Sequence, residues 1–116
     1  MANSRTKGHN FERQIAKLFR ELGFACTTSR FSSKEKDDAK IDLCGTDPFH
    51  IQLKAVERLG SYHSIISSLP KEKGFYRVLM HKKNHSGTIV AMELDSFVEL
   101  LQKLINAGEI CPQSKD

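Results

Sequence analysis

Asp42, Gln52 and Lys54 are polar residues whose types and spacing could support chemistry on a pair of strands. Asp42 lies between apolar residues in the segment 40–45, and Gln52 and Lys54 alternate with apolar residues in the segment 48–56. The Gly-Thr-Asp-Pro run that joins the two segments is typical of a turn, which predicts a β-hairpin. Because side chains two residues apart on a strand share a face, Gln52 and Lys54 point the same way.

If Asp42 faces the same side, a carboxylate, an amide oxygen and an ammonium group converge. Carboxylate and amide oxygens are ligands that suit a hard cation such as Mg²⁺. The ammonium group could then stabilise a metal-activated water or a developing negative charge. The same three residues also suit the ordinary polar face of an exposed hairpin, so the spacing alone leaves both interpretations open.

The composition limits the fold and the partners. The chain has 116 residues, of which 39% are hydrophobic, enough for one domain with a real core. The net charge of +4 favours a polyanionic partner. There is no apolar run of membrane-spanning length, no secretory signal and no helix with a membrane-binding face, so we predict a cytoplasmic protein that binds nucleic acid rather than a membrane. The three cysteines lack zinc spacing and are expected to be reduced.

The first predicted helix covers 8–22, where apolar residues recur every three or four positions. Its apolar stripe consists of Phe11, Ile15, Leu18, Phe19 and Leu22. Asn10 is the expected N-cap, and Gly23 is placed to end the helix. A basic arm at 1–7 precedes it, and this arm is either a frayed terminus or a contact for phosphates.

Alternation and turn residues predict the remaining elements. These are strands at 24–29, 74–81 and 88–92, a polar loop at 29–39, a helix at 61–69, and a final helix capped by Asp95 or Ser96 and ended by Gly108. The order is α-β-β-β-α-β-β-α, which predicts an α/β fold with a mixed sheet flanked by helices. We interpret residues 1–116 as a single domain with a loose tail at 109–116.

The order of the polar residues resembles that of the PD-(D/E)xK nuclease superfamily: Glu12 on the first helix, then Ile41-Asp42-Leu43, then Gln52-Leu53-Lys54. More closely, the chain resembles the archaeal-type Holliday junction resolvases and their phage-encoded relatives. The segments that carry this closer resemblance are Ser4 to Gly8, Phe11 to Ala16, Gly23-Phe24, Ser29-Arg30, Lys40 to Gly45, His50 to Lys54, Val56 to Leu59, His81 to Asn84, and Leu94 to Phe97. Together they span most of the domain.

This resemblance implies a restriction-endonuclease-like fold and a DNA endonuclease that depends on Mg²⁺, with Mn²⁺ as a substitute metal. It implies that Asp42 is the central metal ligand, that Lys54 is the catalytic lysine, and that Glu12 reaches metal-bound water. Gln52 occupies the position usually held by an acid, and the backbone carbonyl of Leu53 is a further ligand. Because an amide oxygen binds Mg²⁺ less strongly than a carboxylate, Gln52 is a departure from the family pattern that weakens the metal site.

The basic arm, the polar loop at 29–39 and the basic loop that begins at His81 could meet DNA phosphates. The resemblance adds that Arg13 and Arg30 match basic positions that hold phosphate, and that Ser29 or Ser32 could match the family's loop serine. The candidates are Arg5, Lys7, Arg13, Ser29, Arg30, Ser32, Lys34, Lys82 and Lys83. Phosphate contacts give salt-dependent affinity with little base readout, which suits a nuclease that recognises the shape of DNA. The histidines at 50, 63, 81 and 85 lack zinc spacing and are expected at the polar surface or on phosphates.

The expected substrate is a four-way (Holliday) junction, cut by two symmetric phosphodiester cleavages. Two symmetric cuts require a homodimer with two active sites, formed through the final helix or through the face of Tyr62, Ile65 and Ile66. Two alternatives remain open. One is a nuclease for other branched or flapped DNA in phage replication or repair, and the other is a non-catalytic DNA-binding module on the same fold. A phage-encoded protein would act in the host cytoplasm.

Overall fold

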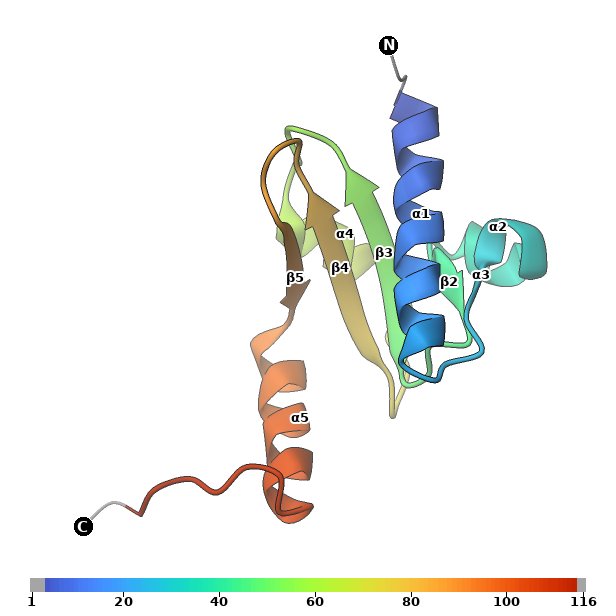
Figure 1. Ribbon diagram of the computed structural model, residues 1–116. Helices are drawn as coiled ribbons and strands as arrows, with labels where there is room; N and C mark the ends of the chain where they lie inside the picture. Colours follow the sequence, from blue (N-terminus) through green and yellow to red (C-terminus); the bar gives the residue numbers. More distant parts are fainter. Residues whose placement is uncertain (1–3, 115–116) are drawn as a thin grey trace.

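The computed structural model describes residues 4–114 and shows a mixed α/β chain with two small sheets (Figure 1). Its elements are α1 (Ser4–Glu21), β1 (Thr27–Thr28), α2 (Ser29–Ser32), α3 (Lys34–Asp38), β2 (Leu43–Cys44), β3 (Phe49–Ala55), α4 (Tyr62–Ser68), β4 (Tyr76–Lys82), β5 (Thr88–Met92) and α5 (Leu94–Asn106). Helices and strands are interleaved as the sequence predicts, but α2 and α3 interrupt the predicted order.

The larger sheet consists of three strands in the order β3-β4-β5. β3 and β4 are parallel, with Gln52 opposite Leu79, and β4 and β5 are antiparallel. The prediction that β4 is central is confirmed, because Val78 and Leu79, which point to opposite faces, are both buried. Helix α1 lies against one face of this sheet, and α4 lies behind the other (Figure 1).

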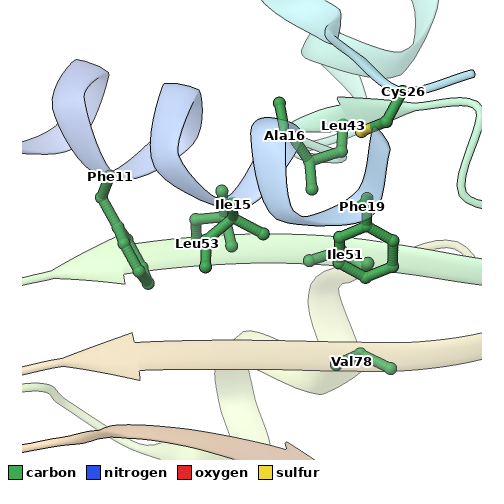
Figure 2. Packing of buried hydrophobic residues seen from close by; sticks show 9 residues of the cluster. All are labelled: Phe11, Ile15, Ala16, Phe19, Cys26, Leu43, Ile51, Leu53 and Val78. Atoms are coloured by element: carbon green, nitrogen blue, oxygen red, sulfur yellow. The ribbon is translucent and has the colours of Figure 1, made fainter. Parts of the chain in front are cut away.

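An apolar stripe holds α1 to the sheet. Phe11, Ile15 and Phe19 are buried with Ile51 and Leu53 of β3 in one cluster (Figure 2). The three- and four-residue spacing that predicts the helix therefore also predicts its buried face. Complete burial of one such side chain contributes about 1.5–3 kcal/mol to folding, so this contact fixes α1 on β3.

Two members of the predicted stripe, Leu18 and Leu22, are exposed instead. Leu18 lies at the flank of the stripe, and Leu22 follows Glu21, the last residue of the helix. Phe24 packs its ring against Phe19 at a centroid distance of 5.2 Å and closes this end of the core.

The start of α1 also differs from the prediction. The helix begins at Ser4, so Arg5 and Lys7 lie in its first turns rather than on a separate arm, and residues 1–3 lie outside the described part of the chain. Asn10 is inside the helix and is not its N-cap. An apolar stripe indicates which residues are buried, but a helix can continue beyond its stripe through polar residues.

The segment 29–39 is not the predicted loop but contains the short helices α2 and α3. Ser33 separates them in an extended conformation, and its Oγ accepts a hydrogen bond from the backbone N–H of Lys36 at 3.2 Å. Serine is a favourable N-cap, which explains why a polar segment becomes helical here. The neighbouring strand is shorter than predicted, with only Thr27 and Thr28 in β1.

The predicted hairpin between the segments 40–45 and 48–56 does not form as a regular ladder. β2 pairs antiparallel with β1, and β3 pairs with β4. One backbone hydrogen bond joins the two predicted strands, from the N–H of Asp42 to the carbonyl of Ile51 at 2.8 Å. Alternation indicates which segments are strands but not which strands pair. The pairing of β2 with β1 and of β3 with β4 therefore depends on tertiary packing.

Helix α5 begins at Leu94 with Glu93 as its N-cap, so the predicted caps Asp95 and Ser96 lie inside the helix. It extends beyond the end of the sheet and makes the molecule elongated, with extents of 57 × 29 × 28 Å (Figure 1). Residues 107–114 contain no helix or strand. Within residues 4–114, no helix combines the length and the apolar character that crossing a membrane requires.

Candidate active site

Asp42 is the most firmly positioned residue of the predicted site. Its backbone N–H bonds the carbonyl of Ile51, and its own carbonyl accepts from the N–H of Ser29 at 2.9 Å. Its side-chain Oδ2 accepts a hydrogen bond from the backbone N–H of Leu53 at 2.7 Å. The carboxylate therefore bonds to the edge of β3 at a position where a neighbouring strand would otherwise accept the hydrogen bond from Leu53. The Leu53 carbonyl points to this same edge, because both polar groups of a strand residue face one neighbour.

The environment of Asp42 opposes its negative charge. Burial raises the pKa of the Asp42 carboxyl to about 6; the negative charges of Glu12 and Asp37 add to this, while the Leu53 N–H and the positive charge of Lys54 act in the opposite direction. Glu12 and Lys54 are thus close enough to Asp42 to act on its proton. The sequence predicts this grouping, although the hairpin that suggested it is not regular.

The raised pKa predicts that the metal-free protein loses stability as the pH rises. An aspartate in an unfolded chain has a pKa of about 3.9, so between about pH 4 and pH 6 the folded state binds more protons than the unfolded state. The free energy of unfolding should therefore fall by about 2–3 kcal/mol across this window, an order-of-magnitude figure. Urea unfolding in EDTA at several pH values would measure it. Asp42→Asn should flatten the dependence, and an equal slope in both proteins would contradict the assignment to Asp42.

Glu12 is held by an arginine from a distant part of the chain. The Nε of Arg30 lies 3.0 Å from Oε1 of Glu12, and the Glu12 side chain is only 16% exposed. Arg30 also stacks over the ring of Phe31 at 4.4 Å and has a buried nitrogen, Nη2, without a hydrogen-bond partner among residues 4–114. Arg30, predicted to hold a phosphate, is therefore paired with the predicted catalytic acid.

Gln52 and Lys54 occupy the face of β3 opposite to the residues that pack on α1, because side chains alternate along a strand. Gln52 is buried, and its Oε1 has no hydrogen-bond partner within the described chain. A buried amide oxygen without a partner is costly, so this atom is suited to receive a donor or a cation. Lys54 is half-buried two residues further along the strand.

A Mg²⁺ ion would have a mixed set of oxygen donors here. No group of three or more His, Cys, Asp and Glu side chains in residues 4–114 could hold a metal ion. The donors that fit the ion are instead the Asp42 carboxylate, the unpartnered Gln52 amide oxygen and the Leu53 carbonyl, with Glu12 available if it leaves Arg30. Such a set carries little negative charge, which favours weak rather than tight metal binding.

Two of the predicted phosphate contacts, Lys7 of α1 and Lys82 at the end of β4, line the same small cavity of about 150 Å³. The other lining residues are Asn10, Phe11, Gln14, Ala55 and Asn84. The Lys82 ammonium lies 3.5 Å from Oε1 of Gln14, and no acidic side chain lines the cavity. Ala55 points to the α1 face of β3, opposite to Lys54, so the cavity lies on the α1 side of the sheet, at the end of β3 and β4.

The remaining predicted phosphate contacts differ in accessibility. Arg5, Arg13, Ser32, Lys34 and Lys83 are exposed, whereas Ser29 is completely buried. The Ser29 hydroxyl donates to the carbonyl of Ile41, so it fixes the start of the Asp42 segment and offers no surface to DNA. Arg13 donates to Oδ1 of Asn10 on the same helix.

Two of the histidines expected at the surface are buried. His81 lies between the hydroxyl of Tyr62 and the carbonyl of Val56, each 2.8 Å from a ring nitrogen. His50 stacks on Phe75 and lies 2.8 Å from the carboxylate of Glu72. His81 points to the face of the sheet covered by α4, and His50 is covered by the segment around Glu72. Alternation with apolar residues is typical of an exposed polar face, so the sequence gives no sign of their burial.

The sequence also did not predict Asn10, Gln14 and Asn84 as neighbours of the two lysines. Lys7, Asn10 and Gln14 follow a helical spacing of three and four residues, which could have signalled a polar stripe on α1. Nothing in the sequence indicates that β4 ends beside this stripe, because that contact depends on how α1 lies across the sheet.

No protein-family model, no curated protein and no solved structure matches this chain. The function therefore has to be inferred from the arrangement of these residues.

Proposed function

We propose that this protein is a Mg²⁺-dependent DNA endonuclease that recognises the shape of branched DNA, with a four-way junction as its preferred substrate. The observation that carries the proposal is the position of Asp42. Its carboxylate is fixed on the backbone of Leu53, the residue that follows Gln52 with its unpartnered buried amide oxygen, and it is within electrostatic range of Glu12 and Lys54. An ordinary polar hairpin face requires none of these features.

Each residue has a role in cleaving a phosphodiester. Asp42, Gln52 and the Leu53 carbonyl would hold Mg²⁺, which supplies positive charge next to the scissile phosphate when bound. The Lys54 ammonium stabilises negative charge that develops on the phosphate oxygens. Arg30 orients Glu12 through their 3.0 Å ion pair, and an approaching phosphate that draws Arg30 away would release the Glu12 carboxylate toward Asp42.

The cavity between Lys7 and Lys82, on the α1 side of the sheet, supports binding of the DNA backbone. Two ammonium groups and several amides around a small opening without acids suit one phosphate group. Further exposed cations on α1, α3 and after β4 extend the basic surface. Such contacts do not distinguish bases, which agrees with recognition by shape.

Lys82→Ala should weaken binding of all DNA substrates by a similar factor. Loss of one phosphate contact is expected to lower the slope of log K against log salt by about 1 in magnitude. Fluorescence anisotropy with a labelled junction and a labelled duplex, each at several salt concentrations, would measure this. Lys103→Ala, on the remote helix α5, is the control with the same loss of charge. An equal loss of DNA affinity in both variants would mean that the affinity depends on the net charge of the protein and not on a contact made by Lys82.

A synthetic four-way junction with one labelled end at a time tests the function directly. Paired, symmetric cuts that appear with Mg²⁺ or Mn²⁺ and disappear with EDTA would support the proposal. Preferential cleavage of flaps or other branches would favour the alternative nuclease.

A non-catalytic DNA-binding module is the second candidate, and the Glu12–Arg30 pair together with the uncharged Gln52 favours it. In that case the junction would be shifted in a gel but remain uncut with both metals. This outcome would overturn the endonuclease proposal.

A further inference from the structure

Phe31 is the most exposed large hydrophobic residue of residues 4–114, at 78%. It belongs to α2, the short helix between β1 and α3 (Figure 1). The guanidinium carbon of Arg30 lies over one face of its ring, 4.4 Å from the ring centre. The rest of the ring, including the opposite face, is therefore open to solvent. A flat apolar surface of this kind is suited to stacking on another ring.

The short helix that carries Phe31 is tied to the candidate active site. The backbone N–H of Ser29 donates to the carbonyl of Asp42 at 2.9 Å, and Ser29 is completely buried. Arg30, the next residue, forms the 3.0 Å ion pair with Glu12. Phe31 follows these two residues directly, so its backbone is fixed relative to both predicted catalytic acids. A group that packs on its ring would therefore lie beside the candidate active site.

Cations and hydroxyl groups, rather than other apolar side chains, accompany Phe31. Helices α2 and α3 contain no second hydrophobic residue. Residues 29–34 include the cations Arg30 and Lys34 and no acid, and both Ser32 and Lys34 are exposed. A protein partner normally meets a contiguous apolar patch, whereas an aromatic ring among cations is typical of surfaces that bind unstacked nucleic acid. The lone ring therefore suits a nucleobase better than a hydrophobic protein surface.

We infer that Phe31 stacks on a nucleobase at the branch point of the DNA and that this contact selects branched DNA over continuous duplex. In a continuous duplex each base is already stacked on both sides, so an inserted ring has to separate two base pairs at a cost in free energy. At a branch point an arm ends, and the face of its last base pair can be covered by the ring without that cost. Stacking of this kind tolerates every base, which agrees with recognition by shape.

The inference rests on the proposed recognition of branched DNA but not on cleavage. Arg30 and Phe31 would divide the recognition of the nucleotide at the branch point, because a cation suits its phosphate and a flat ring suits its base. Phosphate contacts alone are made equally by duplex and branched DNA, so the ring supplies the preference.

Fluorescence anisotropy in EDTA, with a labelled four-way junction and a labelled duplex of the same arm sequence, tests this contact without cleavage. Phe31→Ala should raise the Kd for the junction about 10-fold and leave the Kd for the duplex within about twofold, because alanine lacks the stacking ring. Phe31→Tyr keeps the ring and should bind the junction within about twofold of wild type. Leu22→Ala removes another strongly exposed hydrophobic side chain, 68% exposed after the end of α1, and should change neither Kd. Circular dichroism would establish that each variant is folded.

Equal junction affinity of wild type and Phe31→Ala would overturn the inference. An equal loss on junction and duplex would overturn it as well, because it would indicate a disturbed Arg30 contact rather than a lost base contact. A protein that needs Phe31 to bind the junction but leaves it uncut with Mg²⁺ and Mn²⁺ would contradict the endonuclease and support the base contact. Cleavage of the junction together with unchanged affinity in Phe31→Ala would support the endonuclease and remove the base contact.

Discussion

Asp42→Asn should reduce the rate of Mg²⁺-dependent junction cleavage at least about 100-fold, while the protein remains folded. An asparagine can still accept the hydrogen bond from the Leu53 N–H through its side-chain oxygen, so the segment before β2 keeps its position. It lacks the negative charge that holds Mg²⁺ and balances Lys54. The measurement is single-turnover cleavage of the labelled junction at saturating protein.

This variant should also separate activity from stability. Asp42 is an acid whose ionised form is disfavoured by burial, so its neutral replacement should not lower the free energy of unfolding at neutral pH and should raise it in EDTA. Lost cleavage with retained stability and retained DNA binding would assign a catalytic role to the carboxylate.

Asp38→Asn is the matched control for the change of charge. Asp38 is an exposed acid at the end of α3, and its removal should leave the cleavage rate within about twofold of wild type. An equal loss of cleavage rate in Asp42→Asn and Asp38→Asn would indicate a general effect of charge on DNA binding. Cleavage by Asp42→Asn at the wild-type rate would contradict the proposed role of Asp42.

Gly45→Ala should lower the free energy of unfolding by at least about 2 kcal/mol. Gly45 has a φ of +77°, where residues with a Cβ are strained. A Cβ at this position would also lie 2.1 Å from the carbonyl oxygen of Ala25, a separation that requires the backbone to move. Urea unfolding followed by circular dichroism would measure the loss.

Gly60→Ala provides the control, because a Cβ there would meet no atom within 4 Å and Gly60 does not have a positive φ. Its effect should be within about 0.5 kcal/mol or slightly stabilising. Since Gly45 directly follows β2, its displacement should also move Asp42 and lower the cleavage rate. Two glycine variants of equal stability would show that the chain does not approach itself closely at Gly45.

The elements with local signals could be predicted from the sequence. The stripe of Phe11, Ile15 and Phe19 predicts α1 and its buried face, and the short apolar run at 88–92 predicts β5 with its observed bounds. Ser61 caps α4 through the N–H of Ser64, and Pro70 follows the end of that helix. These elements can be predicted because periodicity and capping involve residues that are close together in the sequence.

Part of the candidate site was also predictable. The types and order of Glu12, Asp42, Gln52 and Lys54 indicate a group of residues that could act together, and the electrostatic environment of Asp42 includes Glu12 and Lys54. The regular hairpin expected to bring them together is absent. Asp42 instead contacts β3 through its side chain, which accepts one hydrogen bond from the backbone N–H of Leu53 in place of the backbone hydrogen bonds of a regular hairpin.

Which segments meet depends on the packing of the whole chain and could not be predicted. This packing paired β2 with β1, buried Ser29, joined Arg30 to Glu12, and placed Lys82 beside Lys7. It also turned the polar side of α5 toward Tyr76 and left the apolar side exposed, although the stripe itself could be predicted. Each of these contacts joins residues far apart in the chain, and their formation depends on the shape of the whole packed molecule rather than on any local pattern.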